Sequence, residues 1–128
     1  MRLILNLALG MILSVVTFAS QSILSDSDHL DLKDGNVFRT GFYLNELMQP
    51  VKRLMDAGHT ITFATPNGLA PALDKSSNDK MYFNGDEESL KIHRSLLDKL
   101  QLTSSKTSPV ISLARVEQIG YDHFDALY

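Results

Sequence analysis

The 128 residues contain no cysteine, and this absence excludes several kinds of chemistry within them. Disulfides, zinc–thiolate sites and a thiol nucleophile all require a side chain that is missing here. A positive surface for nucleic acid is also absent, because 12 Lys and Arg residues face 15 Asp and Glu residues for a net charge of −3. We therefore expect no nucleic-acid partner.

Metal and serine-hydrolase signatures are missing as well. The four histidines have no His-x-x-x-His spacing, and there is no Gly-x-Ser-x-Gly elbow. We expect no metal and no cofactor. The histidines are interpreted as surface or turn residues rather than ligands: His29, His59, His93 and His123.

The first residues follow the layout of a secretory signal. A basic start at Met1–Arg2 precedes an apolar run from Leu3 to Phe18, and small residues follow at Ala19 and Ser20. We predict a signal peptide over residues 1–19 and a secreted or periplasmic protein, with no stable membrane span after cleavage. The alternatives are an uncleaved anchor, for which the run is somewhat short, and a buried strand.

One helix and one strand are predicted clearly from periodicity. Apolar residues between Leu44 and Met55 recur at helical spacing, with Thr40 as a possible N-cap and Gly58 as a stop. Pro50 predicts a kink or a division into two helices. Alternation from Thr60 to Thr65 predicts a strand, which the Pro66-Asn67-Gly68 turn ends.

The remaining segments of residues 20–128 complete an expected α/β pattern. A second helix should begin at Asp86 and bury a stripe of Leu90, Ile92, Leu96, Leu97 and Leu100. The other expectations are an edge strand or a clipped first strand at Ser22–Ser25, an acidic loop at Asp26–Gly35, an irregular segment at Leu69–Asn84, a short strand or extended arm at Pro109–Val116, and a core strand within Tyr121–Tyr128. An apolar strand at the end of the chain suggests a truncated domain.

An ordered series of segments resembles one known superfamily. The series comprises Thr40-Gly41-Phe42-Tyr43-Leu44-Asn45-Glu46-Leu47, Asp56-Ala57-Gly58-His59, Ile61-Thr62-Phe63-Ala64-Thr65-Pro66-Asn67-Gly68, Ala70-Pro71-Ala72-Leu73-Asp74 and Tyr121-Asp122-His123-Phe124-Asp125-Ala126-Leu127-Tyr128. It is similar to the N-terminal portion of the PfpI endopeptidase and parkinsonism-associated deglycase superfamily, also called class I glutamine amidotransferase-like. Its branch of glutathione-independent glyoxalases (glyoxalase III) and heat-shock chaperones is the most similar.

The resemblance implies a fold and a chemistry. The fold is a flavodoxin-like three-layer sandwich with a parallel sheet, here truncated, and members are commonly homodimers. The chemistry acts on methylglyoxal-like aldehydes through a cysteine, an adjacent histidine and a helix glutamate, and this glutamate maps onto Glu46. Because the cysteine and the glycine-rich turn before it are missing, the chain alone should be inactive. The alternative is a non-catalytic chaperone-like or truncated protein, with Glu46 as an ordinary solvated glutamate.

Overall fold

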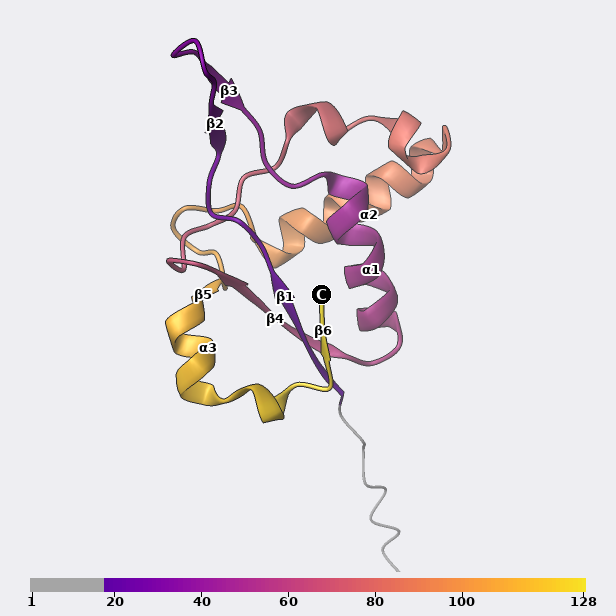
Figure 1. The fold of residues 1–128 in the computed structure, drawn as a ribbon. Coiled ribbons are helices and arrows are strands. Elements are labelled where there is room, and N and C mark those ends of the chain that lie inside the picture. Colours follow the sequence, from indigo (N-terminus) through magenta and orange to yellow (C-terminus); the bar gives the residue numbers. More distant parts are fainter. Residues whose placement is uncertain (1–17) are drawn as a thin grey trace, which may run out of the picture.

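A computed structural model describes residues 18–128, which form an α/β fold around a parallel sheet (Figure 1). The four strands of this sheet lie in the order β5-β4-β1-β6, and every neighbouring pair is parallel. The strands are β1 (Ala19–Ile23), β2 (His29–Asp31), β3 (Val37–Arg39), β4 (Thr60–Thr65), β5 (Ile111–Ser112) and β6 (Ala126–Leu127). The helices are α1 (Leu44–Asp56), α2 (Glu87–Leu100) and α3 (Leu113–Ile119), with 3₁₀ turns at Lys75–Ser77, Lys80–Phe83 and Tyr121–His123.

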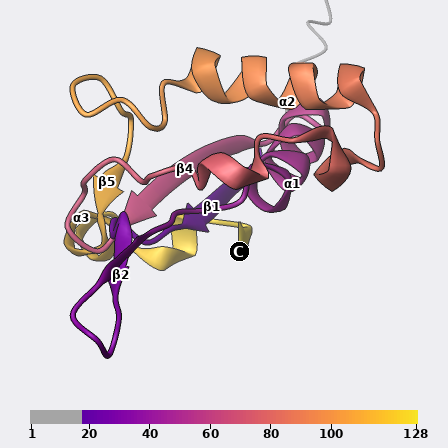
Figure 2. The same cartoon turned by 90° about the horizontal axis from the view of Figure 1, so that it is seen from above.

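The helices lie on both faces of the sheet, as Figure 2 shows. Helices α1 and α2 pack together on one face, and α3 lies on the other. The chain moves outward from β1 through β4 to β5, and then returns past β1 to place β6 on its other side. This confirms the predicted α/β class, and the arrangement is consistent with a flavodoxin-like three-layer fold. The direction of the connections reverses between β1 and β6.

Helix α1 is continuous through Pro50. The predicted division into two helices is therefore wrong, and the predicted kink stays a prediction, since proline leaves the carbonyl of Glu46 without its usual helical N–H donor. Thr40 is not the N-cap: the helix begins after Tyr43, and the Ser77 hydroxyl accepts the Leu44 N–H at 2.9 Å. The helix is held because Leu44, Leu47, Met48 and Val51 enter the main core.

Strand β1 lies in the centre of the sheet and is not an edge strand. The strand also begins three residues before the predicted segment, and Ser20, Gln21 and Ser22 are all buried between β4 and β6. The predicted acidic loop is also wrong in part. It holds β2, which pairs with β3 in an antiparallel hairpin that turns at Gly35, where φ is +81°.

Helix α2 begins where the acidic residues predicted, with Asp86 accepting the N–H groups of Glu88 and Ser89. The apolar stripe predicted for α2 differs from the buried face of the helix at one position. Ile92 is 42% exposed, whereas His93 is 9% exposed and packs against Phe83. The surface assignment of His93 is therefore wrong.

The C-terminal expectations hold only in part. The segment predicted as a strand or arm contains the two-residue β5 and then α3, which begins with the Ser112 hydroxyl accepting the Arg115 N–H. The last segment does join the sheet as β6, but at its edge, where Leu127 is 61% exposed. A strand in the core was therefore the wrong expectation.

Most of the predicted signal peptide lies outside the described residues. Strand β1 begins at Ala19, so the predicted boundary after residue 19 falls inside this strand. No helix within residues 18–128 is long and apolar enough to cross a membrane.

Candidate functional site

A cavity of about 180 Å³ lies where the connections of the sheet reverse. It is bounded by the carboxyl ends of β1 and β6 and by the start of α1, through Ser22, Ile23, Leu24, Phe42, Tyr43, Glu46, Leu47 and Tyr128. In open α/β sheets, ligands bind in the crevice outside the carboxyl ends of the strands at this reversal. The cavity is therefore the place in the fold where a small-molecule site is expected.

Glu46 provides the carboxylate of this cavity. It lies in the first turn of α1 and its side chain is exposed to solvent. A carboxylate at this position is stabilised by the positive end of the helix dipole. The structure thus places the predicted residue at the switch-point cavity, and its catalytic role stays a prediction.

The segment before α1 is fixed by a close contact with the chain around Ala72. A Cβ added to Gly41 would lie 2.1 Å from the Ala72 carbonyl oxygen, so only glycine fits there. Next to it, the Phe42 N–H donates to the Ala72 carbonyl and the Asp74 N–H donates to the Phe42 carbonyl, both at 2.9 Å. These contacts set the position from which α1 begins and hence the position of Glu46.

Three hydroxyl groups of the cavity were not found by sequence reasoning: those of Ser22, Tyr43 and Tyr128. Burial raises the pKa of the Tyr128 phenol, with the Ser22 hydroxyl acting in the opposite direction. A phenol with a raised pKa stays protonated at neutral pH and can donate a hydrogen bond. The Ser22 and Tyr128 side chains meet only because residue 128 hydrogen-bonds beside β1, and no local sequence pattern predicts this pairing.

Tyr43 is held in place by a second phenol. Its ring meets that of Tyr82 edge to face, with centroids 5.4 Å apart. Burial, and then the neighbouring Tyr43, raise the pKa of Tyr82. The raised pKa keeps the Tyr82 hydroxyl neutral at neutral pH.

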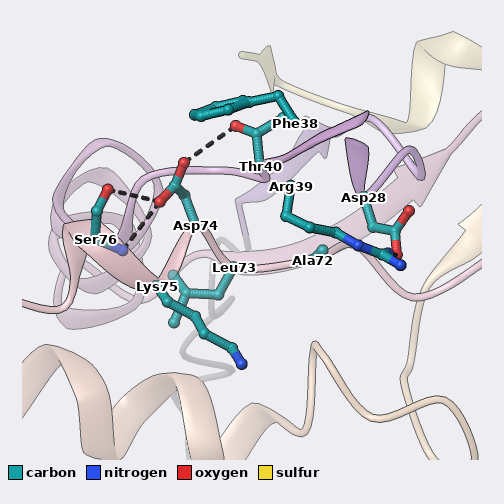
Figure 3. A pocket seen from close by; sticks show the side chains of 9 residues that line it. All are labelled: Asp28, Phe38, Arg39, Thr40, Ala72, Leu73, Asp74, Lys75 and Ser76. Carbon is teal, nitrogen blue, oxygen red and sulfur yellow. Dashed lines mark hydrogen bonds and ion pairs between the residues drawn. The ribbon is translucent and has the colours of Figure 1, made fainter. Parts of the chain in front are cut away.

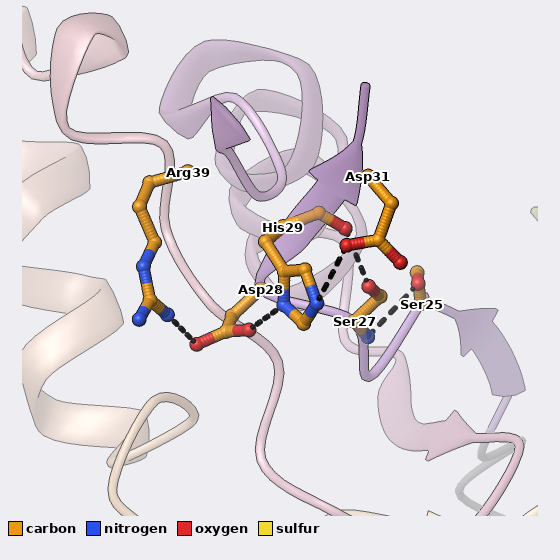
Figure 4. A network of polar contacts seen from close by, with 6 residues as sticks. All are labelled: Ser25, Ser27, Asp28, His29, Asp31 and Arg39. Carbon is orange, nitrogen blue, oxygen red and sulfur yellow. Dashed lines mark hydrogen bonds and ion pairs between the residues drawn. The ribbon is translucent and has the colours of Figure 1, made fainter. Parts of the chain in front are cut away.

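The histidines lie away from this cavity. His59 contacts the Ser20 hydroxyl at 2.8 Å, and the His93 ring is 2.7 Å from the Ser89 carbonyl, to which its N–H donates. His29 joins an exposed network with Asp28 and Asp31 on the hairpin (Figure 4). Within residues 18–128, no group of three or more His, Asp or Glu residues is placed to hold a metal ion.

A second cavity of about 580 Å³ lies between the β2–β3 hairpin and residues 72–76 (Figure 3). Asp74 lines it, with one carboxylate oxygen accepting from Thr40 and the other from the hydroxyl and N–H of Ser76. These hydrogen bonds, chiefly those from Ser76, hold the pKa of Asp74 below its ordinary value. This cavity is larger than the one that contains Glu46, but it is not at the reversal of the sheet.

Comparison with known proteins assigns no family to this chain. No protein-family model matches the sequence, and no curated protein matches it either.

Proposed function

We propose that this chain forms part of a PfpI-like protein of the glyoxalase III type, in which Glu46 moves a proton during conversion of a small α-oxoaldehyde. One observation carries the proposal: a carboxylate from the start of α1 lies on the wall of the switch-point cavity. The cavity volume is about that of six water molecules, at roughly 30 Å³ each. A three- or four-carbon aldehyde is of this size.

The reaction begins with a thiolate that adds to the aldehyde carbon and forms a hemithioacetal. Glu46 then takes the proton from that carbon and returns a proton to the neighbouring carbon. The proton of the hemithioacetal hydroxyl passes to the neighbouring carbonyl oxygen, which becomes a hydroxyl while the first carbon becomes the thioester carbonyl. The product is the thioester of a 2-hydroxy acid, and water releases the acid and the thiol. No electrons enter or leave, so no redox partner is needed.

The thiol is the component that these 128 residues do not contain. A small added thiol forms the same hemithioacetal with methylglyoxal in solution, and this allows the role of Glu46 to be tested in the chain as it is. We expect the chain with methylglyoxal and 2-mercaptoethanol to form lactoyl thioester faster than the buffer does. Without the thiol, we expect no lactate.

The matched variants are Glu46→Gln and Glu88→Gln. Both replace an exposed glutamate in the first turn of a helix, but Glu88 lies in α2 and does not line the cavity. We expect Glu46→Gln to reduce the rate to that of the buffer and Glu88→Gln to leave it unchanged. Equal rates for the wild type and Glu46→Gln would contradict the proposal.

A chaperone-like binding protein is a second candidate, because the β2–β3 hairpin exposes apolar side chains. Leu30 and Phe38 are paired across the two strands and are 56% and 54% exposed, and Leu32 and Val37 are exposed beside them. Contiguous exposed apolar residues are typical of surfaces that bind other proteins. This proposal predicts that the chain slows the aggregation of heat-unfolded citrate synthase.

The hairpin variant for this test is Leu30→Ser with Phe38→Ser. Met81→Ser serves as the control, because Met81 is 69% exposed but lies in the turn before α2. The candidate requires that only the hairpin variant loses the effect. A loss of the same size in both variants would exclude the hairpin as the binding surface.

A further inference from the structure

The larger cavity is bounded by two separate parts of the chain. One wall is the base of the β2–β3 hairpin, with Asp28, Phe38, Arg39 and Thr40, and the other is the segment from Ala72 to Ser76. Its volume of about 580 Å³ is within the range of small-molecule sites in proteins. Phe38 and Leu73 make part of the lining apolar.

Asp74 carries a negative charge that no cation balances in the described part of the chain. Its residue is only 9% exposed, and its three hydrogen-bond donors are the Thr40 hydroxyl and the hydroxyl and N–H of Ser76. No lysine, arginine or histidine of residues 18–128 forms an ion pair with it. Its hydrogen bonds stabilise the ionised carboxylate without neutralising its charge, so a ligand cation beside Asp74 would be attracted to it.

A positive group lies on the same wall. Lys75 lines the cavity and is exposed, and within the described residues it forms no ion pair. Arg39 is less available, because its guanidinium is 2.6 Å from the Asp28 carboxylate. Figure 3 shows that the Asp74 and Lys75 side chains extend in different directions from adjacent positions. A ligand that contacts both must therefore carry opposite charges at separated ends.

We propose that this cavity binds a small zwitterion of the dipeptide type, with its ammonium group at Asp74 and its carboxylate at Lys75. Apolar atoms in the middle of the ligand would pack on Phe38 and Leu73. This inference is independent of the function proposed for Glu46, because the two cavities share no lining residue.

Titration of the full chain with glycyl-leucine, followed by amide NMR shifts, tests the proposal. We expect shifts in residues 38–40 and 72–76. N-acetyl-glycyl-leucine lacks the ammonium group, and glycyl-leucinamide lacks the carboxylate. Each should bind more weakly, by up to about fivefold, as expected when one exposed charge contact is lost.

Lys75→Gln provides a test that preserves the fold, because the side chain is exposed and takes part in no hydrogen bond within the described residues. In this variant, glycyl-leucine and its amide should bind equally. Lys80 is an exposed lysine that does not line the cavity, and the Lys80→Gln variant should still bind glycyl-leucine more tightly than its amide. Equal binding of all three peptides to the wild type, absence of binding, or shifts confined to other residues would each overturn the proposal.

Discussion

Phe42 and Leu73 form a parallel bridge that lies between the two cavities. Phe42 lines the cavity of Glu46, and Leu73 lines the larger one. The hydrogen bonds on either side of the bridge tie the entry to α1 to the segment that carries Asp74. The geometry of both candidate sites therefore depends on one short backbone contact.

Gly41→Ala should disrupt this contact. The added Cβ would lie 2.1 Å from the Ala72 carbonyl oxygen, and no side-chain rotation can relieve an overlap with backbone. We expect a loss of about 3 kcal/mol or more in the free energy of unfolding, at the upper end of the range for overpacking. Urea unfolding followed by circular dichroism measures it.

Gly58→Ala is the control for that variant. Gly58 has a φ of +89°, but a Cβ there meets no atom within 4 Å. Only the backbone conformation is penalised, at about 1–2 kcal/mol. A Gly41→Ala chain as stable as the Gly58→Ala chain would show that the approach to Ala72 is not required.

Ser77→Ala should loosen the start of α1. The buried Ser77 hydroxyl accepts the Leu44 N–H at 2.9 Å and donates to the Asp74 carbonyl at 2.6 Å. Its removal leaves a buried N–H without a partner, which costs about 1–3 kcal/mol. Ser105→Ala, at an exposed loop position, should change the unfolding free energy by less than about 0.5 kcal/mol. Equal effects in the two variants would contradict the role assigned to Ser77.

The stability of the protein should depend on the ionisation of Asp74. Its pKa in the folded state lies below the ordinary value of 3.8, so near that pH the unfolded chain binds more protons than the folded one. The contribution of Asp74 is complete above this range and is lost as the pH falls through the folded pKa. The stability difference between the wild type and Asp74→Asn should therefore narrow between about pH 5 and about pH 2. Urea midpoints across this range measure the difference, and one that stays constant would refute the assignment.

Local patterns are enough to predict α1, β4 and the start of α2. In α1 the core residues Leu44, Leu47 and Val51 recur at helical spacing, and in α2 the acidic residues mark the first turn. Helix α3 was missed because it has seven residues and only Val116 is buried. The central position of β1 could not be predicted, because its Ser-Gln-Ser sequence is polar and its burial comes from neighbours distant in the sequence.

The candidate site was predictable to the same limited extent. Glu46 could be singled out because its segment resembles a family motif. Tyr128 and Ser22 could not, because they meet only through the pairing of β1 with β6. The cavity beside Asp74 likewise depends on the β2–β3 hairpin, whereas the sequence predicts an acidic loop over Asp26–Gly35.

The most direct test of the central claim follows a hydrogen atom. Methylglyoxal with deuterium on its aldehyde carbon, incubated with the chain and 2-mercaptoethanol, gives lactate whose C2 position can be examined by NMR. Because the Glu46 carboxylate is exposed to solvent, the deuterium that it removes should exchange with water. The lactate that the wild type forms in excess of the Glu46→Gln variant should therefore carry mainly hydrogen at C2. Full retention of deuterium at C2 would contradict proton transfer through the solvent-exposed Glu46 carboxylate.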